Sequence, residues 1–143
     1  MMRHHRAFFD LTGRTALVTG GSSGIGEAMA HALGKAGATI ILMARRVDAL
    51  TVSADRLREL GIPAHTLSCD LSDINAIERG AKAAMSISPI HILVNAASVN
   101  LRERFEQVTA EIWQTRINLH LSAPFFLTQA LVPQMKANGG GAS

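Results

Sequence analysis

Short apolar runs alternate along the chain with segments in which apolar residues recur at every third or fourth position. Most of the runs are continuous and rich in β-branched residues, which is typical of strands that are buried on both faces of a sheet. The runs that predict strands are Thr15–Thr19, Thr39–Ala44, Ala64–Ser68 and His91–Asn95.

The periodic segments predict helices with the usual residues at their ends. In the first of them the apolar residues at helical spacing are Ile25, Ala28, Met29, Ala32, Leu33 and Ala36, and Gly37 ends the helix. The other helices are expected at residues 47–60, from the turn at 70–73 to about residue 84, and at residues 110–119 and 124–136.

Strands that alternate with helices predict a parallel sheet that is covered on both faces. Because crossovers between parallel strands are right-handed, the expected fold class is α/β, a Rossmann-like doubly wound sheet with the strand order 3-2-1-4. A chain of 143 residues corresponds to about one domain. We expect a flexible arm over residues 1–10 and this domain over residues 11–143.

A glycine-rich segment joins the first expected strand to the first expected helix. Glycine permits the sharp turn and lets a ligand approach the backbone, while free N–H groups at a helix N-terminus favour a diphosphate. A glycine cluster alone is weak evidence, but a strand before it and a helix after it are the context in which such a loop binds a dinucleotide. The candidate cofactor-binding residues here are Gly20, Ser22, Ser23, Gly24, Ile25 and Gly26.

The T-G-x-x-x-G-I-G pattern from Thr19 to Gly26 resembles the glycine motif of the short-chain dehydrogenase/reductase (SDR) family. Further matches follow in order at Cys69-Asp70-Leu71, Asn95-Ala96-Ala97 and Asn118, so that the resemblance covers the chain from about Phe9 to Gly140. It implies a single NAD(P)-binding Rossmann domain and hydride transfer between a nicotinamide and a carbonyl or alcohol.

The resemblance also implies roles for the later matches. Asp70 and Leu71 would face the adenine ring, Asn95, Ala96 and Ala97 would lie along the cofactor, and Asn118 would be the one remaining member of the catalytic Asn-Ser-Tyr-Lys tetrad. Simpler interpretations stay open, because Asp70 could cap the next helix and Asn95 could be a turn residue. Asparagine is unfavourable inside a helix, so we expect a local kink or a bound water at Asn118.

The choice between NAD and NADP depends on the residues that follow the second strand. An acidic residue there would accept hydrogen bonds from a ribose 2′-OH, but the chain has Arg45 and Arg46 and no acid before Asp48. Arg45 is placed to bind a 2′-phosphate with two hydrogen bonds from its guanidinium. The expected cofactor is therefore NADP, with NAD as the alternative, and both arginines could instead be solvated loop residues.

The family's other catalytic residues, a serine and a Tyr-x-x-x-Lys motif, have no counterpart here. The chain contains no tyrosine and ends at Ser143, where the family's fifth strand would begin, so we expect a C-terminally incomplete domain that is inactive by itself. For an intact relative we expect an NAD(P)-dependent oxidoreductase that acts on CH–OH groups of a small molecule, as a homo-oligomer. The alternative is a non-catalytic nucleotide-binding fragment or the remnant of an interaction partner.

Composition narrows the remaining classes of protein function. Basic residues form no stripe despite the net charge of +3, and aromatics make up only 4% of the chain, so nucleic-acid binding is not expected. No apolar stretch approaches the roughly 18 residues of a membrane span. The single cysteine, Cys69, excludes an internal disulfide and a Cys-cluster metal site, and it fits a cytoplasmic protein. His4 and His5 are expected to be part of the arm, not metal ligands.

Overall fold

A computed structural model of the chain describes residues 10–21, 24–97 and 103–139. Within these ranges four parallel strands form one sheet in the order β3-β2-β1-β4, which confirms the predicted order. The strands are β1 (Thr15–Thr19), β2 (Thr39–Ala44), β3 (Ala64–Ser68) and β4 (Ile92–Asn95). The first three have the predicted bounds, and β4 begins at Ile92 instead of His91.

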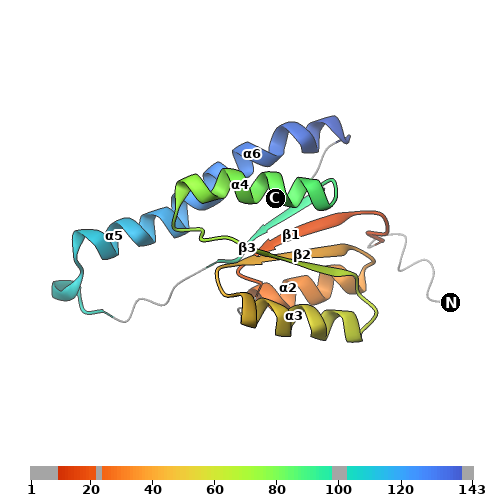
Figure 1. Cartoon of the computed structure of the whole chain (residues 1–143), viewed down its shortest axis with the longest axis horizontal. Coiled ribbons are helices and arrows are strands. Elements are labelled where there is room, and N and C mark those ends of the chain that lie inside the picture. Colours follow the sequence, from red (N-terminus) through yellow and green to blue (C-terminus); the bar gives the residue numbers. More distant parts are fainter. Residues whose placement is uncertain (1–9, 22–23, 98–102, 140–143) are drawn as a thin grey trace.

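Helices cover both faces of the sheet (Figure 1). On one face lie α2 (Gly24–Lys35) and α3 (Val47–Glu59), and on the other lie α4 (Ile74–Ile87) and α6 (Ala123–Ala137). Successive residues of a strand point to opposite faces, so that Leu17 is buried in the core beneath α4 and α6, while Val18 is buried in the core beneath α2 and α3. The doubly wound α/β arrangement is thereby confirmed.

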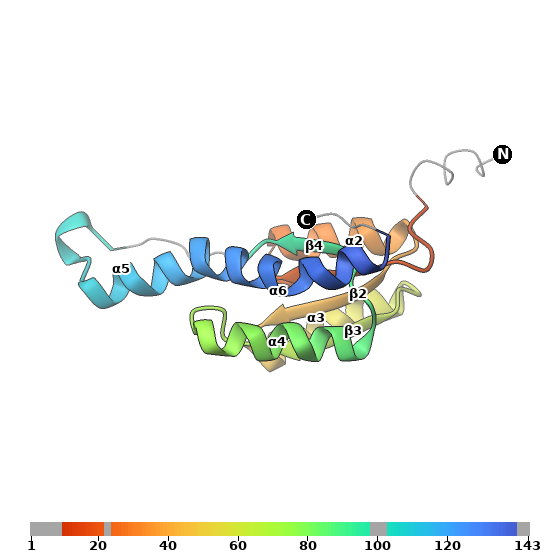
Figure 2. The ribbon, with the colours of Figure 1, turned by 90° about the horizontal axis from the view of Figure 1, so that it is seen from above.

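A long helical rod extends beyond the sheet (Figure 2). It consists of α5 (Ala110–Ile117), a π-helical segment (Asn118–Ser122) and α6, without the interruption that the sequence predicted after residue 119. The backbone N–H of Ala123 donates to the carbonyl of Asn118, and this wider turn takes the place of the kink expected at Asn118. None of the helices in the described ranges has the length and apolarity needed to cross a bilayer.

The residues that α2 buries against the sheet are small ones, not its large apolar side chains. Gly26, Ala30 and Gly34 are its buried residues, whereas Ile25 is 72% exposed and Met29 is 41% exposed. A Cβ on Gly34 would lie 2.5 Å from a methyl carbon of Ile62, so the helix packs too closely for a larger side chain on that side. The apolar spacing identified the helix correctly, but the close contact, which the spacing cannot reveal, decides which side faces inward.

Candidate functional site

The carboxyl ends of parallel strands meet at one edge of a sheet, and this edge holds most of the predicted site residues. Gly20 follows β1, Arg45 follows β2, Asp70 lies just after β3, and Asn95 ends β4. The fold therefore brings together residues that are far apart in the sequence. Ser22 and Ser23, which were also predicted to bind the cofactor, lie outside the described residues.

Two glycines of the predicted motif are required by the protein's own packing. Gly20 has a φ of +66°, and a Cβ there would lie 2.7 Å from the Cα of Ala97. A Cβ on Gly26 would overlap the carbonyl oxygen of Gly20. These glycines allow the chain to turn sharply from β1 into α2 while passing close to the end of β4.

Gly24 differs from these two because, outside its chain neighbours and its own helix backbone, a Cβ at this position would meet no atom of the described residues within 4 Å. It is the first residue of α2, and the next residue, Ile25, is also exposed. The first turn of a helix carries unsatisfied N–H groups and the positive end of the helix dipole. Open space at this point is what the close approach of a diphosphate to the backbone requires.

Thr19, which the sequence prediction did not include among the site residues, fixes the end of β4 to the end of β1. Its Oγ1 accepts hydrogen bonds from the backbone N–H of Ala96 at 3.1 Å and of Ala97 at 3.4 Å, and it donates to the carbonyl of Val94 at 3.3 Å. Thr19 is buried, so these bonds are shielded from water. The signals that could have found it are its place as the last residue of β1 and as the first residue of the T-G-x-x-x-G-I-G pattern.

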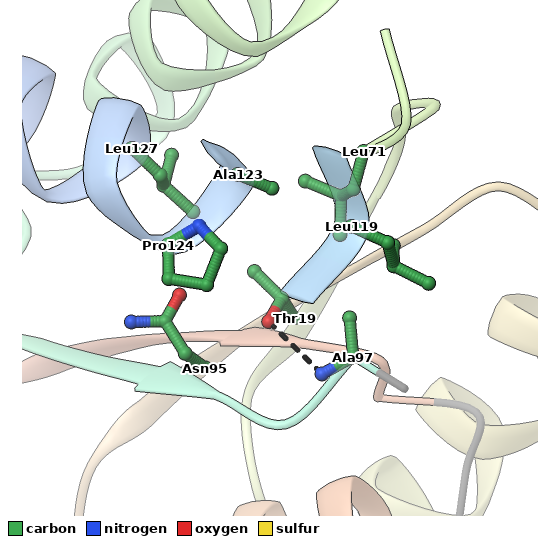
Figure 3. Close-up of a pocket in the computed structure, with 8 residues that line it drawn as sticks. All are labelled: Thr19, Leu71, Asn95, Ala97, Leu119, Ala123, Pro124 and Leu127. Carbon is green, nitrogen blue, oxygen red and sulfur yellow. Dashed lines mark hydrogen bonds between the residues drawn. The ribbon is translucent and has the colours of Figure 1, made fainter. Parts of the chain in front are cut away.

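A cavity of about 10 Å³, enough for one water molecule, lies at this edge between the sheet and the rod (Figure 3). The side chains around it come from the ends of β1 and β4, from the turn after β3, from the π-helical segment and from the start of α6. Three predicted site residues, Leu71, Asn95 and Ala97, are among them, together with Thr19. The glycine turn and the rod thus meet at one place.

The Asp70 carboxylate is held by the turn that follows β3. Its Oδ1 accepts hydrogen bonds from the Ser72 hydroxyl at 2.6 Å and from the Ser72 backbone N–H at 3.0 Å. The Ser72 hydroxyl is the main cause that lowers the pKa of Asp70, and Arg45 adds to it. The residue that caps α4 is Asp73, whose Oδ1 accepts from the Asn75 N–H at 3.0 Å, so the alternative role of Asp70 as that helix cap is wrong.

The two arginines after β2 face different surroundings. Arg46 forms an exposed ion pair with Asp48 at 3.5 Å, and such a pair contributes little to stability. Arg45 lines a cavity together with Asp70, and in the described part of the chain it has no ion-pair partner. Of the two guanidinium groups, that of Arg45 is the one available to an anion beside the Asp70 turn.

Asn118 links the rod to the Asp70 turn. Its side-chain amide donates to the carbonyl of Ser72 at 3.0 Å, and its Oδ1 accepts from the Gln114 side chain at 2.8 Å. It is also the residue at which the π-helical segment begins. Segments of π-helix inside α-helices occur frequently at functional sites.

The comparisons with known proteins agree with this arrangement. The family described as short chain dehydrogenase matches residues 14–142, and the chain belongs to this family. Gluconate 5-dehydrogenase of Gluconobacter oxydans is 33% identical over 138 residues, which cover 96% of this chain and 54% of that protein. D-xylose 1-dehydrogenase of Caulobacter vibrioides is 35% identical over 133 residues, which cover 92% of this chain and 52% of that protein.

Solved structures of reductases superpose well on this chain. A 3-oxoacyl (acyl-carrier-protein) reductase from Agrobacterium tumefaciens with NADP bound has a TM-score of 0.88 at 33% identity, over 95% of this chain and 53% of that one. L-sorbose reductase from Gluconobacter frateurii, complexed with NADPH and L-sorbose, has a TM-score of 0.86 at 35% identity, over 93% of this chain and 51% of that one. The chain spans about half the length of the relatives it matches.

Proposed function

We propose that this chain is the dinucleotide-binding part of an NADP(H)-dependent oxidoreductase that transfers hydride between the nicotinamide and a carbonyl or alcohol. The observation that carries the proposal is the open first turn of α2 at Gly24, at the same sheet edge as Arg45, which has no ion-pair partner among the described residues. Relatives that were solved with NADP or NADPH bound support the choice of cofactor. When bound, the cofactor supplies or accepts the hydride.

Each group of site residues fits one part of such a cofactor. The backbone of the turn from Gly20 to Gly26 would hold the diphosphate, because Gly24 leaves the first turn of α2 open. Asp70 and Leu71 would face the adenine, and Arg45 would bind the 2′-phosphate. The remaining cofactor residues proposed are Ser22, Ser23, Ile25, Arg46, Asn95, Ala96 and Ala97.

The chemical step needs a group that gives a proton to the substrate oxygen or takes one from it. In the SDR family this group is a tyrosine, and the 143 residues contain none. We therefore assign binding and orientation of the cofactor to these residues, and we assign Asn118 a positioning role through the π-helical segment and the Ser72 carbonyl.

For the substrate we propose a small polyhydroxylated molecule. The support is the set of relatives named for gluconate, D-xylose and L-sorbose. We also propose a homo-oligomer, supported by exposed apolar side chains along the rod, and a cytoplasmic location, supported by the one free cysteine.

Equilibrium titration of the chain with NADP⁺ and NADPH tests the proposal. We expect saturable binding that Gly24→Val abolishes, because the new side chain would occupy the space in which the diphosphate would lie. Ala32→Val is the matched control, since it adds a β-branched residue to an exposed position of the same helix. Binding that survives Gly24→Val would show that the ligand does not use this turn, and absence of binding to the unaltered chain would favour the non-catalytic interaction fragment.

A further inference from the structure

A second cavity, of about 450 Å³, opens at the edge of the sheet between β3 and α4. It shares two residues with the proposed cofactor site, because Arg45 and Asp70 line it. Small residues of α4 form its wall, and Gly80 must be small, since a Cβ there would lie 2.9 Å from the Cys69 sulfur. On α4 a second cation, Arg79, also lines the cavity, although no motif of the sequence pointed to it.

The four charged side chains of this cavity differ in how they are held. Both carboxylates are fixed by local hydrogen bonds, Asp70 by Ser72 and Asp73 by the N–H of Asn75. Across the described ranges neither Arg45 nor Arg79 has an ion-pair partner. The N–H donors of the two guanidinium groups are therefore available to a ligand, whereas the two carboxylates are held by their local hydrogen bonds.

The charge balance of the cavity lining shows why one arginine would be insufficient to bind a phosphate group. Arg45 and Arg79 together balance Asp70 and Asp73, so the lining is neutral, and without Arg79 it would carry one net negative charge. A phosphate monoester has a charge of about −1.5 to −2 at neutral pH. A lining with two carboxylates and one guanidinium would repel such a group, whereas two guanidinium groups can hold it by charge-assisted hydrogen bonds.

Both arginines act on the groups around the cavity. After the Ser72 hydrogen bond, Arg45 contributes to the lowered pKa of Asp70. Burial is the main cause of the raised pKa of the Cys69 thiol, and Arg79 opposes that effect. The two cations thus influence neighbouring groups of the lining, Arg45 the Asp70 carboxyl and Arg79 the Cys69 thiol.

We infer that Arg79 is a second 2′-phosphate-binding residue, which together with Arg45 makes the site prefer NADP over NAD. This inference rests on the proposed function and extends it by a specificity-determining residue on α4. A hydroxyl in place of the phosphate has no need of the second cation, so Arg79 contributes to the binding of NADP and not to that of NAD.

Calorimetric titration of the chain with NADP⁺ and with NAD⁺ tests this role. We expect Arg79→Gln to weaken NADP⁺ binding by about tenfold or more, as for the loss of a charge-assisted hydrogen bond, with NAD⁺ affinity changed by less than about twofold. Lys82→Gln removes the same charge from an exposed position of the same helix outside the cavity lining, and it should change neither affinity. Far-UV circular dichroism checks that both variants are folded.

A variant with the opposite effect makes the test independent of damage to the protein. Asp73→Asn removes one opposing carboxylate but keeps a good helix cap, and it should tighten NADP⁺ binding several-fold without improving NAD⁺ binding. Unchanged NADP⁺ affinity in Arg79→Gln, or an equal loss for both cofactors, would overturn the inference. If the unaltered chain binds neither cofactor, the proposed function itself fails, and the inference fails with it.

Discussion

At the scale of single residues, the site depends on which neighbours hold each side chain. The sequence singled out Arg45 of the two arginines after the second strand, but it could not show what surrounds that guanidinium or whether Asp70 caps the next helix. Adjacent residues at the end of a strand point in opposite directions, so Arg45 faces the Asp70 cavity while Arg46 faces Asp48 and the α2–α3 side. Which of Asp70 and Asp73 caps α4 likewise depends on backbone geometry that only the structure shows.

The hydrogen bonds of Ser72 lead to a prediction for the pH dependence of the Asp70 turn. Ser72→Ala removes the main cause that lowers the pKa of Asp70, so this pKa should rise towards its ordinary value of 3.8. Titration of the Asp70 carboxyl group by NMR measures the change. Ser86→Ala is the control, because the Ser86 hydroxyl bonds only within α4, to the Lys82 carbonyl, and that variant should leave the Asp70 titration unaltered.

The substitution Ser72→Ala should also alter the stability of the folded chain in acid. A carboxyl group whose pKa is lower in the folded chain than in the unfolded chain stabilises the fold above the unfolded value, and this contribution is lost as pH falls through the folded pKa. Below pH 3.8 the unaltered chain should therefore lose stability more steeply than Ser72→Ala does. Parallel curves for the two proteins would show that the Ser72 bonds do not favour the charged form of Asp70.

At the scale of elements, the sequence was sufficient for the type and order of the strands and insufficient for the packing of the helices. Continuous apolar runs identify buried strands directly, and right-handed crossovers then fix their order. The buried side of α2 could not be predicted from the sequence because it consists of Gly26, Ala30 and Gly34, which contribute little apolar signal. The rod was predicted as two helices because Pro124 suggests a new start, whereas the π-helical segment carries the backbone through that point.

Gly34 of α2 packs closely against Ile62, so the substitution Gly34→Ala tests this contact. Helix propensity alone would make Gly34→Ala stabilising by about 1 kcal/mol. Because the added Cβ would lie 2.5 Å from a side-chain carbon of Ile62, we expect destabilisation instead, by about 1–3 kcal/mol. Denaturant unfolding followed by circular dichroism gives the sign, and a stabilised variant would refute the close packing.

At the scale of the whole molecule, the chain combines the proposed cofactor site with a sequence that contains no tyrosine. We predict that the chain of 143 residues binds NADPH without oxidising it when carbonyl substrates are added, because it has no tyrosine to act as the proton donor. Absorbance of NADPH with a panel of ketoses and keto acids measures this, with Gly24→Val as the background. Steady oxidation above that background would show that another group supplies the proton.

The exposed apolar side of the rod leads to the last prediction, which concerns association. Phe105, in a short 3-10 helix (Phe105–Gln107) that precedes the rod, is 94% exposed. Along the rod, Trp113, Leu121 and Phe125 are each more than 60% exposed. The first three of these side chains border an apolar cavity of about 590 Å³, and large exposed patches of this kind mark interaction surfaces.

We therefore expect the chain to self-associate at micromolar concentrations through the rod, because burying each of these side chains contributes about 1.5–3 kcal/mol. Size-exclusion chromatography with light scattering gives the mass, and the fluorescence of Trp113, the only tryptophan, should shift to shorter wavelength as the rod becomes covered.

Leu121→Glu should restore a monomer because it introduces a charge on the apolar side. Val52→Glu, at an exposed position of α3 on the opposite face of the sheet, should not. Association that persists in Leu121→Glu would assign the contact to another surface, and the edge of β4, which has no further partner among the described strands, would then be the next to test.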